Sequence, residues 1–214
     1  MGLLKAQQVN LSTNSTPSVF NPQDLPMLLL GLTDSDVELR RMSAKDLGHY
    51  PEAAEDLANQ LAHEENAGVC ESIFNSLGRI GTEEAVHVLL PFLRSDRAFL
   101  RNAAIEVLRG LPQSVAPAME NLIHDPDPDV RIFAVNVLES LRHPKVVEWL
   151  VEVIENDMHI NVCATALDLL AEVGDESCLS AVEVATDRFP NEPYLQFAVN
   201  MAIHRITEGK GAIQ

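Results

Sequence analysis

The sequence predicts an all-α fold, an α-α superhelix of about five stacked helix pairs with a capping helix at each end. Apolar residues follow helical spacing, and no stretch sustains the alternation of a strand. The tetrapeptide Phe-Ala-Val-Asn occurs at residues 133–136 and again at 197–200, which is 64 positions later. Leucine-like residues before a turn recur every 30 to 32 residues, so 64 is two repeats. These recurring positions are Leu47, Leu77, Leu108, Leu138, Leu170 and Ala202.

The elements follow from this period in chain order. Residues 1–21 are rich in Ser, Thr, Asn and Gln with little apolar periodicity, which predicts a flexible N-terminal arm. Residues 22–208 form the predicted solenoid, with 23–32 as its first cap and 192–208 as its last. Residues 209–214 are expected to be a C-terminal tail.

Each repeat is expected to hold a first helix, a short turn and a second helix. In one unit, the apolar positions of the first helix are Val130, Phe133, Ala134, Val137, Leu138 and Leu141. Those of the second helix are Val146, Val147, Leu150, Val151 and Ile154. A single pair cannot bury its apolar face alone, so stacked pairs are expected to share one continuous core.

Helix start and stop signals have the same period as the core pattern. Asp36 and Asp129 are placed to accept hydrogen bonds from the free amide groups of a helix start, and Pro128 suits the entry to that turn. Several glycines fall at helix ends, where a left-handed residue is expected to close the turn. These glycines are Gly48, Gly78, Gly81, Gly110 and Gly174.

The stretch Asp-Pro-Asp-Val-Arg at residues 127–131 resembles the short HEAT-like repeat of phycobilin lyases and of many bacterial interaction proteins. A looser copy begins at Asp34, and the resemblance covers about residues 23–208. The last copy departs from the pattern, with Leu195 in place of the arginine. The resemblance implies a solenoid whose second helices line the concave face, and it is specific for fold rather than function.

Composition excludes several classes of function. The 214 residues include 32 acidic and 15 basic side chains, and the net charge of −17 repels nucleic acid and anionic membranes. No apolar run approaches the roughly 18 residues that cross a bilayer, and the protein is expected to be cytoplasmic. The cysteines, Cys70, Cys163 and Cys178, form no Cys-x-x-Cys pair, and Cys70 and Cys163 are expected to be small buried residues.

No catalytic triad, phosphate loop, dinucleotide fingerprint or set of metal ligands is present, so no enzyme activity, cofactor or metal is expected. Of seven histidines, only His63 is followed by glutamate, which argues against a di-iron site built from several His-Glu pairs. Arg40, Arg101 and Arg131 recur at one repeat position, and we expect them to pair with acidic groups on the neighbouring repeat.

Acidic and basic residues are segregated along the chain. Residues 146–187 carry ten carboxylates and residues 46–78 carry seven, in both cases without a lysine or arginine. The arginines between these blocks are Arg94, Arg97, Arg101 and Arg109. Because sequence order is spatial order in a solenoid, acidic ends and a more basic middle are expected. The charge serves either a binding surface or ordinary solubility.

The single tryptophan, Trp149, stands between Glu148 and Glu152. Either it is a hot spot for a basic partner, or it packs against the next repeat. The resemblance implies that second helices line the concave face, which would place several further polar residues, Ser180 among them, on or near that surface. The candidate protein-binding residues are Glu84, His87, Glu148, Trp149, Glu152 and Glu183.

The sequence therefore predicts a non-catalytic scaffold or adaptor that binds another protein, one with a basic surface, and neither nucleic acid nor membrane. The alternative, carried by the resemblance, is a phycobilin-lyase-like chromophore-handling enzyme or auxiliary subunit.

Overall fold

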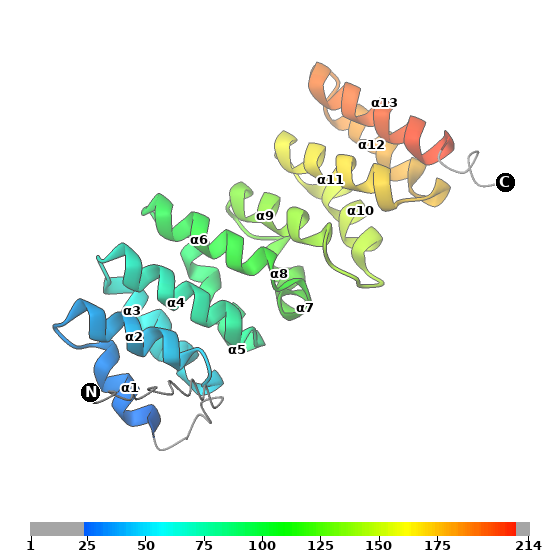
Figure 1. The fold of residues 1–214 in the computed structure, drawn as a ribbon. Coiled ribbons are helices and arrows are strands. Elements are labelled where there is room, and N and C mark those ends of the chain that lie inside the picture. Colours follow the sequence, from blue (N-terminus) through cyan, green and yellow to red (C-terminus); the bar gives the residue numbers. More distant parts are fainter. Residues whose placement is uncertain (1–23, 209–214) are drawn as a thin grey trace, which may run out of the picture.

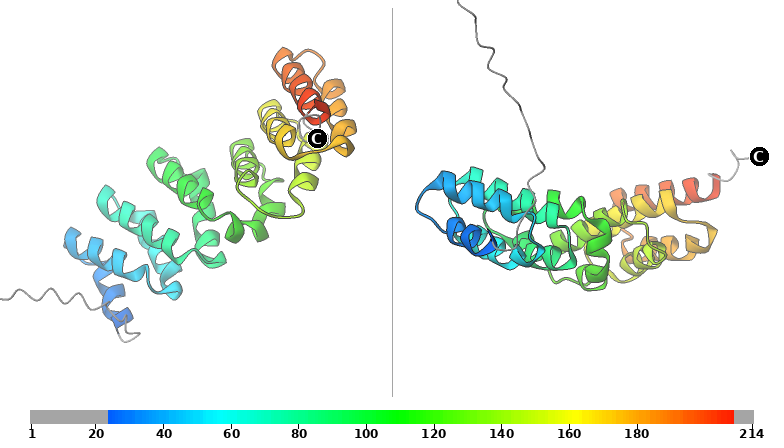
Figure 2. Two further views of the ribbon diagram at one scale, coloured as in Figure 1. Left: turned by 45° about the vertical axis from the view of Figure 1, so that its right-hand side comes forward. Right: turned by 60° about the horizontal axis from the view of Figure 1, so that its bottom comes forward.

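The computed structural model of the protein describes residues 24–208 as a stack of helix pairs (Figure 1). Helices of one kind form a first-helix row: α2 (Val37–Leu47), α4 (Ala67–Ile80), α6 (Ala98–Arg109), α9 (Pro128–Leu138) and α11 (Ile160–Val173). Their partners form a second-helix layer: α3 (Ala54–His63), α5 (Glu83–Leu89), α7 (Pro112–Val115) with α8 (Met119–Leu122), α10 (Val146–Asn156) and α12 (Leu179–Arg188). The two layers lie side by side along the whole arc (Figure 2).

The predicted α-α superhelix of five helix pairs is confirmed. The first pair is preceded by α1 (Leu25–Leu32) and the last is followed by α13 (Pro193–Glu208), which agree with the predicted caps within two residues. Residues 24–208 contain no strand. The predicted arm at residues 1–21 and tail at 209–214 lie outside the described residues.

The recurring leucines of the sequence lie at the centre of the core. Leu47, Leu77, Leu108, Leu138 and Leu170 are each at most 1% exposed. Burial of one such side chain contributes about 2 kcal/mol. All five belong to one continuous hydrophobic core along the stack, so the period of the sequence is the period of the packing. Within the described part of the chain, no helix is long and apolar enough to span a bilayer.

The two Phe-Ala-Val-Asn copies do not occupy equivalent positions, which corrects the interpretation of their spacing. Phe133 is buried at 4% exposure, whereas Phe197 is 64% exposed. The cause is one extra residue, because α9 begins at Pro128 and α13 begins at Pro193, which is 65 positions later. The superhelix has the predicted period, and the tetrapeptide match is out of register by one residue.

One of the two predicted aspartate caps needs correction. Asp36 does cap α2, since its side chain accepts a hydrogen bond from the Glu38 backbone N–H at 2.8 Å. Asp129 is not the cap of α9, because that helix begins two residues earlier and Asp127 accepts from the Asp129 N–H at 2.9 Å. The fixed φ of Pro128 suits the first turn of a helix, and this sets the earlier start.

Among the predicted left-handed glycines, only Gly81 has a positive φ, of 59°. Gly48, Gly110 and Gly174 have φ values of −62°, −74° and −79°, which any residue adopts. Gly48 is instead a point of close approach, since a Cβ atom there would lie 2.7 Å from the Ser76 hydroxyl of α4. The prediction of a left-handed residue at each helix end was therefore wrong except at Gly81.

Candidate protein-binding surface

The turn before each first helix is built on a recurring polar side chain. This residue stands three positions before the helix and accepts a hydrogen bond from the backbone N–H two residues further on, at 2.8 to 3.2 Å. The accepting residues are Asp34, Glu64, Ser95, Asp125 and Asp157. Each turn thus presents a carboxylate or hydroxyl at the edge of the next repeat.

Two of these carboxylates are held by arginines of the preceding repeat. The guanidinium of Arg40 binds both carboxylate oxygens of Glu64, at 2.8 and 3.0 Å. Arg131 binds both oxygens of Asp157 in the same way, at 2.6 and 3.0 Å. The carboxylates are buried, with side chains 3% and 5% exposed. The prediction that Arg40 and Arg131 pair with the neighbouring repeat is confirmed.

For Arg101 the same prediction was wrong. Its guanidinium donates to the Ser95 carbonyl oxygen at 2.7 Å, and within residues 24–208 no carboxylate forms an ion pair with it. The corresponding carboxylate, Asp125, pairs with Arg94 instead. At the junction between α6 and α9, the arginine of the first helix therefore makes no forward ion pair, unlike Arg40 and Arg131.

These pairs fix the charge of the buried groups. The hydrogen bond from Arg40 is the main cause that lowers the pKa of Glu64 from 4.5 to about 2. The hydrogen bond to Asp157 raises the pKa of Arg131. The Arg40–Glu64 pair is therefore ionised at neutral pH. Both arginine–carboxylate pairs join neighbouring repeats and are not offered to a partner.

Exposed carboxylates gather on the second-helix layer and the turns beside it. They are Glu52, Glu55, Asp56, Glu83, Glu84, Glu120, Glu148, Glu155, Glu176, Glu183 and Asp187. Two basic residues of this layer already have partners inside the protein. Lys145 pairs with Glu120 at 2.7 Å, and Arg188 donates to the carbonyl oxygens of Ile154 and Asp157. The second-helix layer is thus an acidic surface along most of the stack.

Glu84 and His87 of α5 lie together at a groove of about 370 Å³ between this repeat and the next. Both side chains are exposed, and Ser114, Pro117 and Asn121 form the facing wall. The structure thus brings two of the predicted site residues together. Glu148 and Glu183 are exposed on α10 and α12, where neither makes an ion pair among the described residues.

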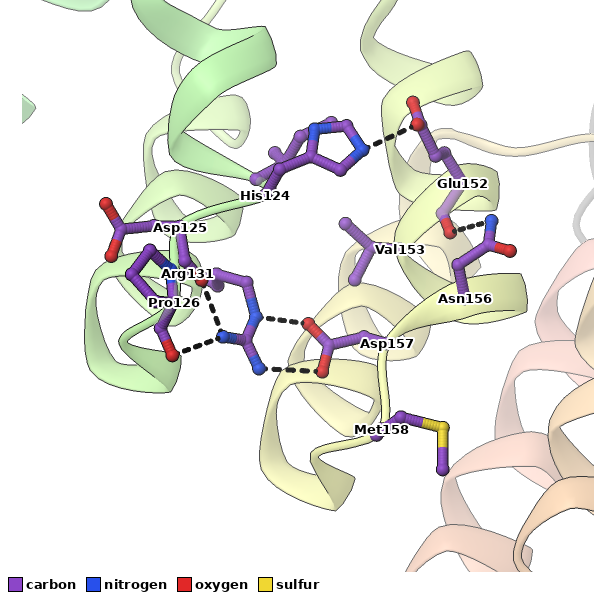
Figure 3. A pocket seen from close by; sticks show the side chains of 10 residues that line it. His124, Asp125, Pro126, Arg131, Glu152, Val153, Asn156, Asp157 and Met158 are labelled. Atoms are coloured by element: carbon purple, nitrogen blue, oxygen red, sulfur yellow. Dashed lines mark hydrogen bonds and ion pairs between the residues drawn. The ribbon is translucent and has the colours of Figure 1, made fainter.

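Glu152 lines a second groove, of about 330 Å³, between the turn before α9 and helix α10. In Figure 3, His124 and Glu152 point toward one another across the groove, with Nε2 and Oε1 2.9 Å apart. Arg131 and Asp157 face each other at its other end, and Met158 lies beyond Asp157. Met158 is 83% exposed, which gives this groove an apolar rim.

Trp149 does not belong to the exposed surface. Its side chain is 3% exposed, and its ring stacks on His143 at 4.9 Å between ring centres, with 14° between the ring planes. Of the two interpretations of this residue, packing describes the structure. Glu148, the residue before it, lies on the exposed side of α10. This carboxylate can therefore contact a partner, whereas the buried ring of Trp149 cannot.

Two residues of the second groove were missed by sequence reasoning. His124 lies in the turn after α8 and reaches α10 only because the repeats stack, and its distance from Glu152 in the sequence carries no motif. Met158 is apolar and lies in the turn between α10 and α11. Helical periodicity does not predict whether a residue in a turn is exposed. Asp157 could have been found, since it follows Arg131 at nearly the spacing by which Glu64 follows Arg40.

The cysteines and histidines give no metal centre in the described part of the chain. No group of three His, Cys, Asp or Glu side chains is placed to hold a metal ion within residues 24–208. The cysteines are free and buried, which confirms the prediction for Cys70 and Cys163. Burial raises the pKa of the Cys163 thiol to about 11, so it is not a nucleophile at neutral pH.

Comparison with known proteins identifies the repeat. The family model described as HEAT repeats matches residues 25–109 and 115–204. A curated relative, the bilin biosynthesis protein PecE of Mastigocladus laminosus, is 31% identical over 157 residues, which is 72% of this chain. The chain spans 57% of the length of that relative.

Two of the solved structures that are similar to this chain come from natural proteins. An archaeal HEAT-like repeats protein from Thermococcus onnurineus NA1 is 18% identical, with a TM-score of 0.47 and coverage of 88% of each chain. The complex of CpcE and CpcF of phycocyanin lyase from Nostoc sp. PCC7120 is 16% identical, with a TM-score of 0.38. That match covers 94% of this chain and 100% of the other.

Proposed function

The chain belongs to the family of HEAT repeat proteins, and from that premise we propose that it is a non-catalytic scaffold or adaptor that binds another protein. The observation that supports this proposal is the acidic second-helix layer, in which Lys145 and Arg188 are already paired inside the protein. An extended surface of one charge sign favours a partner of the opposite sign. The partner is therefore expected to present a basic surface.

The binding residues proposed on this layer are Glu84, His87, Glu148, Glu152 and Glu183. The first two share a groove, and Glu152 lines another, so the layer offers concave places as well as charge. Trp149 completes the set as a support, since its buried ring fixes the position of α10.

The test is an affinity capture from the native cell lysate at low and moderate salt, followed by the same capture with Glu148→Lys/Glu183→Lys. We expect one recurrent partner that is lost as salt rises and is lost with the double variant, because exposed charge pairs are screened. The matched control is Glu65→Lys/Glu71→Lys, which makes the same charge change away from the second-helix layer. Equal capture by both double variants would mean that the layer does not bind the partner.

A second candidate function rests on the curated relative. PecE is described as a bilin biosynthesis protein, and the similarity supports a chromophore-handling enzyme or auxiliary subunit as the alternative. Mixing the purified protein with a linear tetrapyrrole tests it directly, because a bound pigment changes its visible absorption. An unchanged spectrum, together with a salt-sensitive protein partner, would leave the scaffold as the better account.

A further inference from the structure

The first-helix row carries two grooves of opposite charge at equivalent places. One lies between α2 and α4, and the other lies between α9 and α11, three repeats further along the chain. The walls formed by α4 and α11 use the same helix positions, because Asn75 matches Asp168 and Arg79 matches Glu172 when counted from the start of each helix. Neither belongs to the second-helix layer that the proposed function uses.

The groove between α2 and α4, here called the basic groove, is lined by Arg41, Lys45 and Arg79, with Glu71 as its one carboxylate. Arg79 leans over α2, since its Nη1 lies 3.4 Å from the Lys45 carbonyl oxygen. Arg41 pairs with Glu38 within α2, where both side chains are about half exposed. The three basic side chains outnumber Glu71 and the Glu38 that pairs with Arg41, so the groove has a net positive charge.

The groove between α9 and α11, here called the acidic groove, is lined by Glu139, Asp168 and Glu172 and contains no basic residue. Glu172 occupies the position in α11 that Arg79 occupies in α4, counted from the start of each helix. Glu139 and Asp168 form no ion pair with the described residues, and Arg205 lies 3.6 Å from Glu172. Two exposed carboxylates are thus left without a counter-charge.

Helix α6 lies midway between the two grooves in the row (Figure 1). Its exposed residues Glu106 and Arg109 are three positions apart, and within residues 24–208 neither forms an ion pair. A two-fold axis through α6 would bring Glu106 of each copy to Arg109 of the other. A surface that is self-complementary about its own centre is what a two-fold interface requires.

We propose that the first-helix row docks a second copy of this chain in an antiparallel, two-fold arrangement, with the basic groove of each copy on the acidic groove of the other. The axis passes at α6, so both groove contacts form together. The net charge of −17 opposes association at long range, and the paired grooves offset it at contact. Dimerisation by the first-helix row leaves the second-helix layer of each copy open to a partner.

The experiment measures the molar mass of the full chain by light scattering and sedimentation. At about 0.1 M salt, where screening acts beyond about 10 Å, we expect twice the chain mass of 23.5 kDa. At about 1 M salt the contact pairs are screened as well, and the mass should fall to that of one chain. A single-chain mass at about 0.1 M salt and high protein concentration would overturn the proposal.

Charge reversal identifies the surface. Arg41→Glu/Lys45→Glu/Arg79→Glu gives a chain with two acidic grooves, and Glu139→Lys/Asp168→Lys/Glu172→Lys gives a chain with two basic grooves. Each variant alone should be monomeric, and an equimolar mixture should recover the dimer, because the grooves are complementary again. Recovery by mixing cannot come from misfolding of either variant.

The control is Glu52→Lys/Glu55→Lys/Asp56→Lys, which reverses three exposed charges beside and on α3 in the second-helix layer. This variant should keep the wild-type mass. If a reversed-groove variant keeps the wild-type mass, or the control loses the dimer while the groove variants do not, the interface lies elsewhere. Should one groove variant fail to fold by circular dichroism, the other tests the same contact from its opposite side.

Discussion

Two junctions of the stack, α2 with α4 and α6 with α9, have an arginine at the same position of their first helix. The contacts that these arginines make are different. At the first, Arg40 donates back to the Asp34 carbonyl oxygen at 2.8 Å and forward to both oxygens of Glu64. At the second, Arg101 donates back to the Ser95 carbonyl oxygen and makes no forward ion pair in the described chain. The same arginine in the same register therefore does not ensure the same junction.

The backward contact is the constant part of the repeat. In α4 and α11 the equivalent residues are Cys70 and Cys163, whose thiols lie 3.6 and 3.2 Å from the carbonyl oxygens of Glu64 and Asp157. In α13 it is Gln196, whose amide donates to Phe189 O at 3.1 Å. Each first helix is thus tied to the turn before it, and only the arginines are long enough to reach the next repeat.

The middle junction relies on exposed contacts instead. Arg94 pairs with Asp125, and Lys145 pairs with Glu120. Arg94, Lys145 and Glu120 are each about half exposed or more, whereas the Asp125 side chain is 11% exposed. Helix α6 also packs more sparsely on α9 than α2 packs on α4. Because exposed pairs contribute under about 1 kcal/mol each, we expect the stack to open first between α6 and α9.

The largest effect is expected from removal of a buried arginine. Arg131→Ala leaves Asp157 buried without its counter-charge, and such a loss costs about 3 kcal/mol or more of the free energy of unfolding. Arg101→Ala, at the equivalent position, removes one hydrogen bond to a carbonyl oxygen and should cost about 1 kcal/mol. Urea denaturation of both variants measures the difference. Equal losses would show that the forward pair does not distinguish the two junctions.

A smaller and pH-dependent effect is expected at Glu64. Arg40 lowers its pKa from 4.5 to about 2, so the ionised carboxylate stabilises the fold above pH 4.5 and that contribution is lost as the pH falls toward 2. The free energy of unfolding, compared between wild type and Glu64→Gln across this range, should differ most at the upper end. A constant difference from pH 5 down to about pH 2.5 would contradict the assignment.

The repeat period, the helix pairs and both caps could be predicted from the sequence, because leucines at the same position in every repeat report the packing directly. The register of the last helix could not, because one added residue in the turn before α13 leaves the apolar period intact while it moves Phe197 to the surface. The forward pair of Arg101 could not either, because a second arginine, Arg94, competes for Asp125.

The candidate surface was predictable in charge and not in detail. The sequence shows that the second helices are rich in carboxylates. The predicted pattern of acidic ends and a more basic middle describes only the order of charges along the chain. In the structure, charges also differ between the two layers of one repeat. Arg41, Lys45 and Arg79 belong to the first-helix row, whereas the carboxylates of α3 belong to the second-helix layer. Helix periodicity interpreted Trp149 as an edge residue, yet α10 buries that edge against His143.

The smallest effect is expected at His124, which joins α8 to α10 across the middle junction. Its Nδ1 lies 2.6 Å from the Glu120 carbonyl oxygen and its Nε2 lies 2.9 Å from Glu152 Oε1. Both neighbours are acceptors, so the imidazolium with two N–H donors satisfies them best. The hydrogen bond to Glu120 O and then the Glu152 carboxylate raise the pKa of His124 above 6.5.

The stabilisation by His124 is therefore complete below pH 6.5 and is lost as the pH rises through the folded-state pKa. Because the side chains are 61% and 40% exposed, we expect under about 1 kcal/mol, seen as faster hydrogen exchange in α8 and α10 at alkaline pH. An NMR titration should give a His124 pKa that is lower in Glu152→Gln than in the wild type. It should still lie above 6.5 in that variant, because the hydrogen bond to the Glu120 carbonyl oxygen remains. A pKa at or below 6.5 in the wild type would mean that protonated His124 does not stabilise the middle junction. The difference in stability between this junction and those of Arg40 and Arg131 would then be larger.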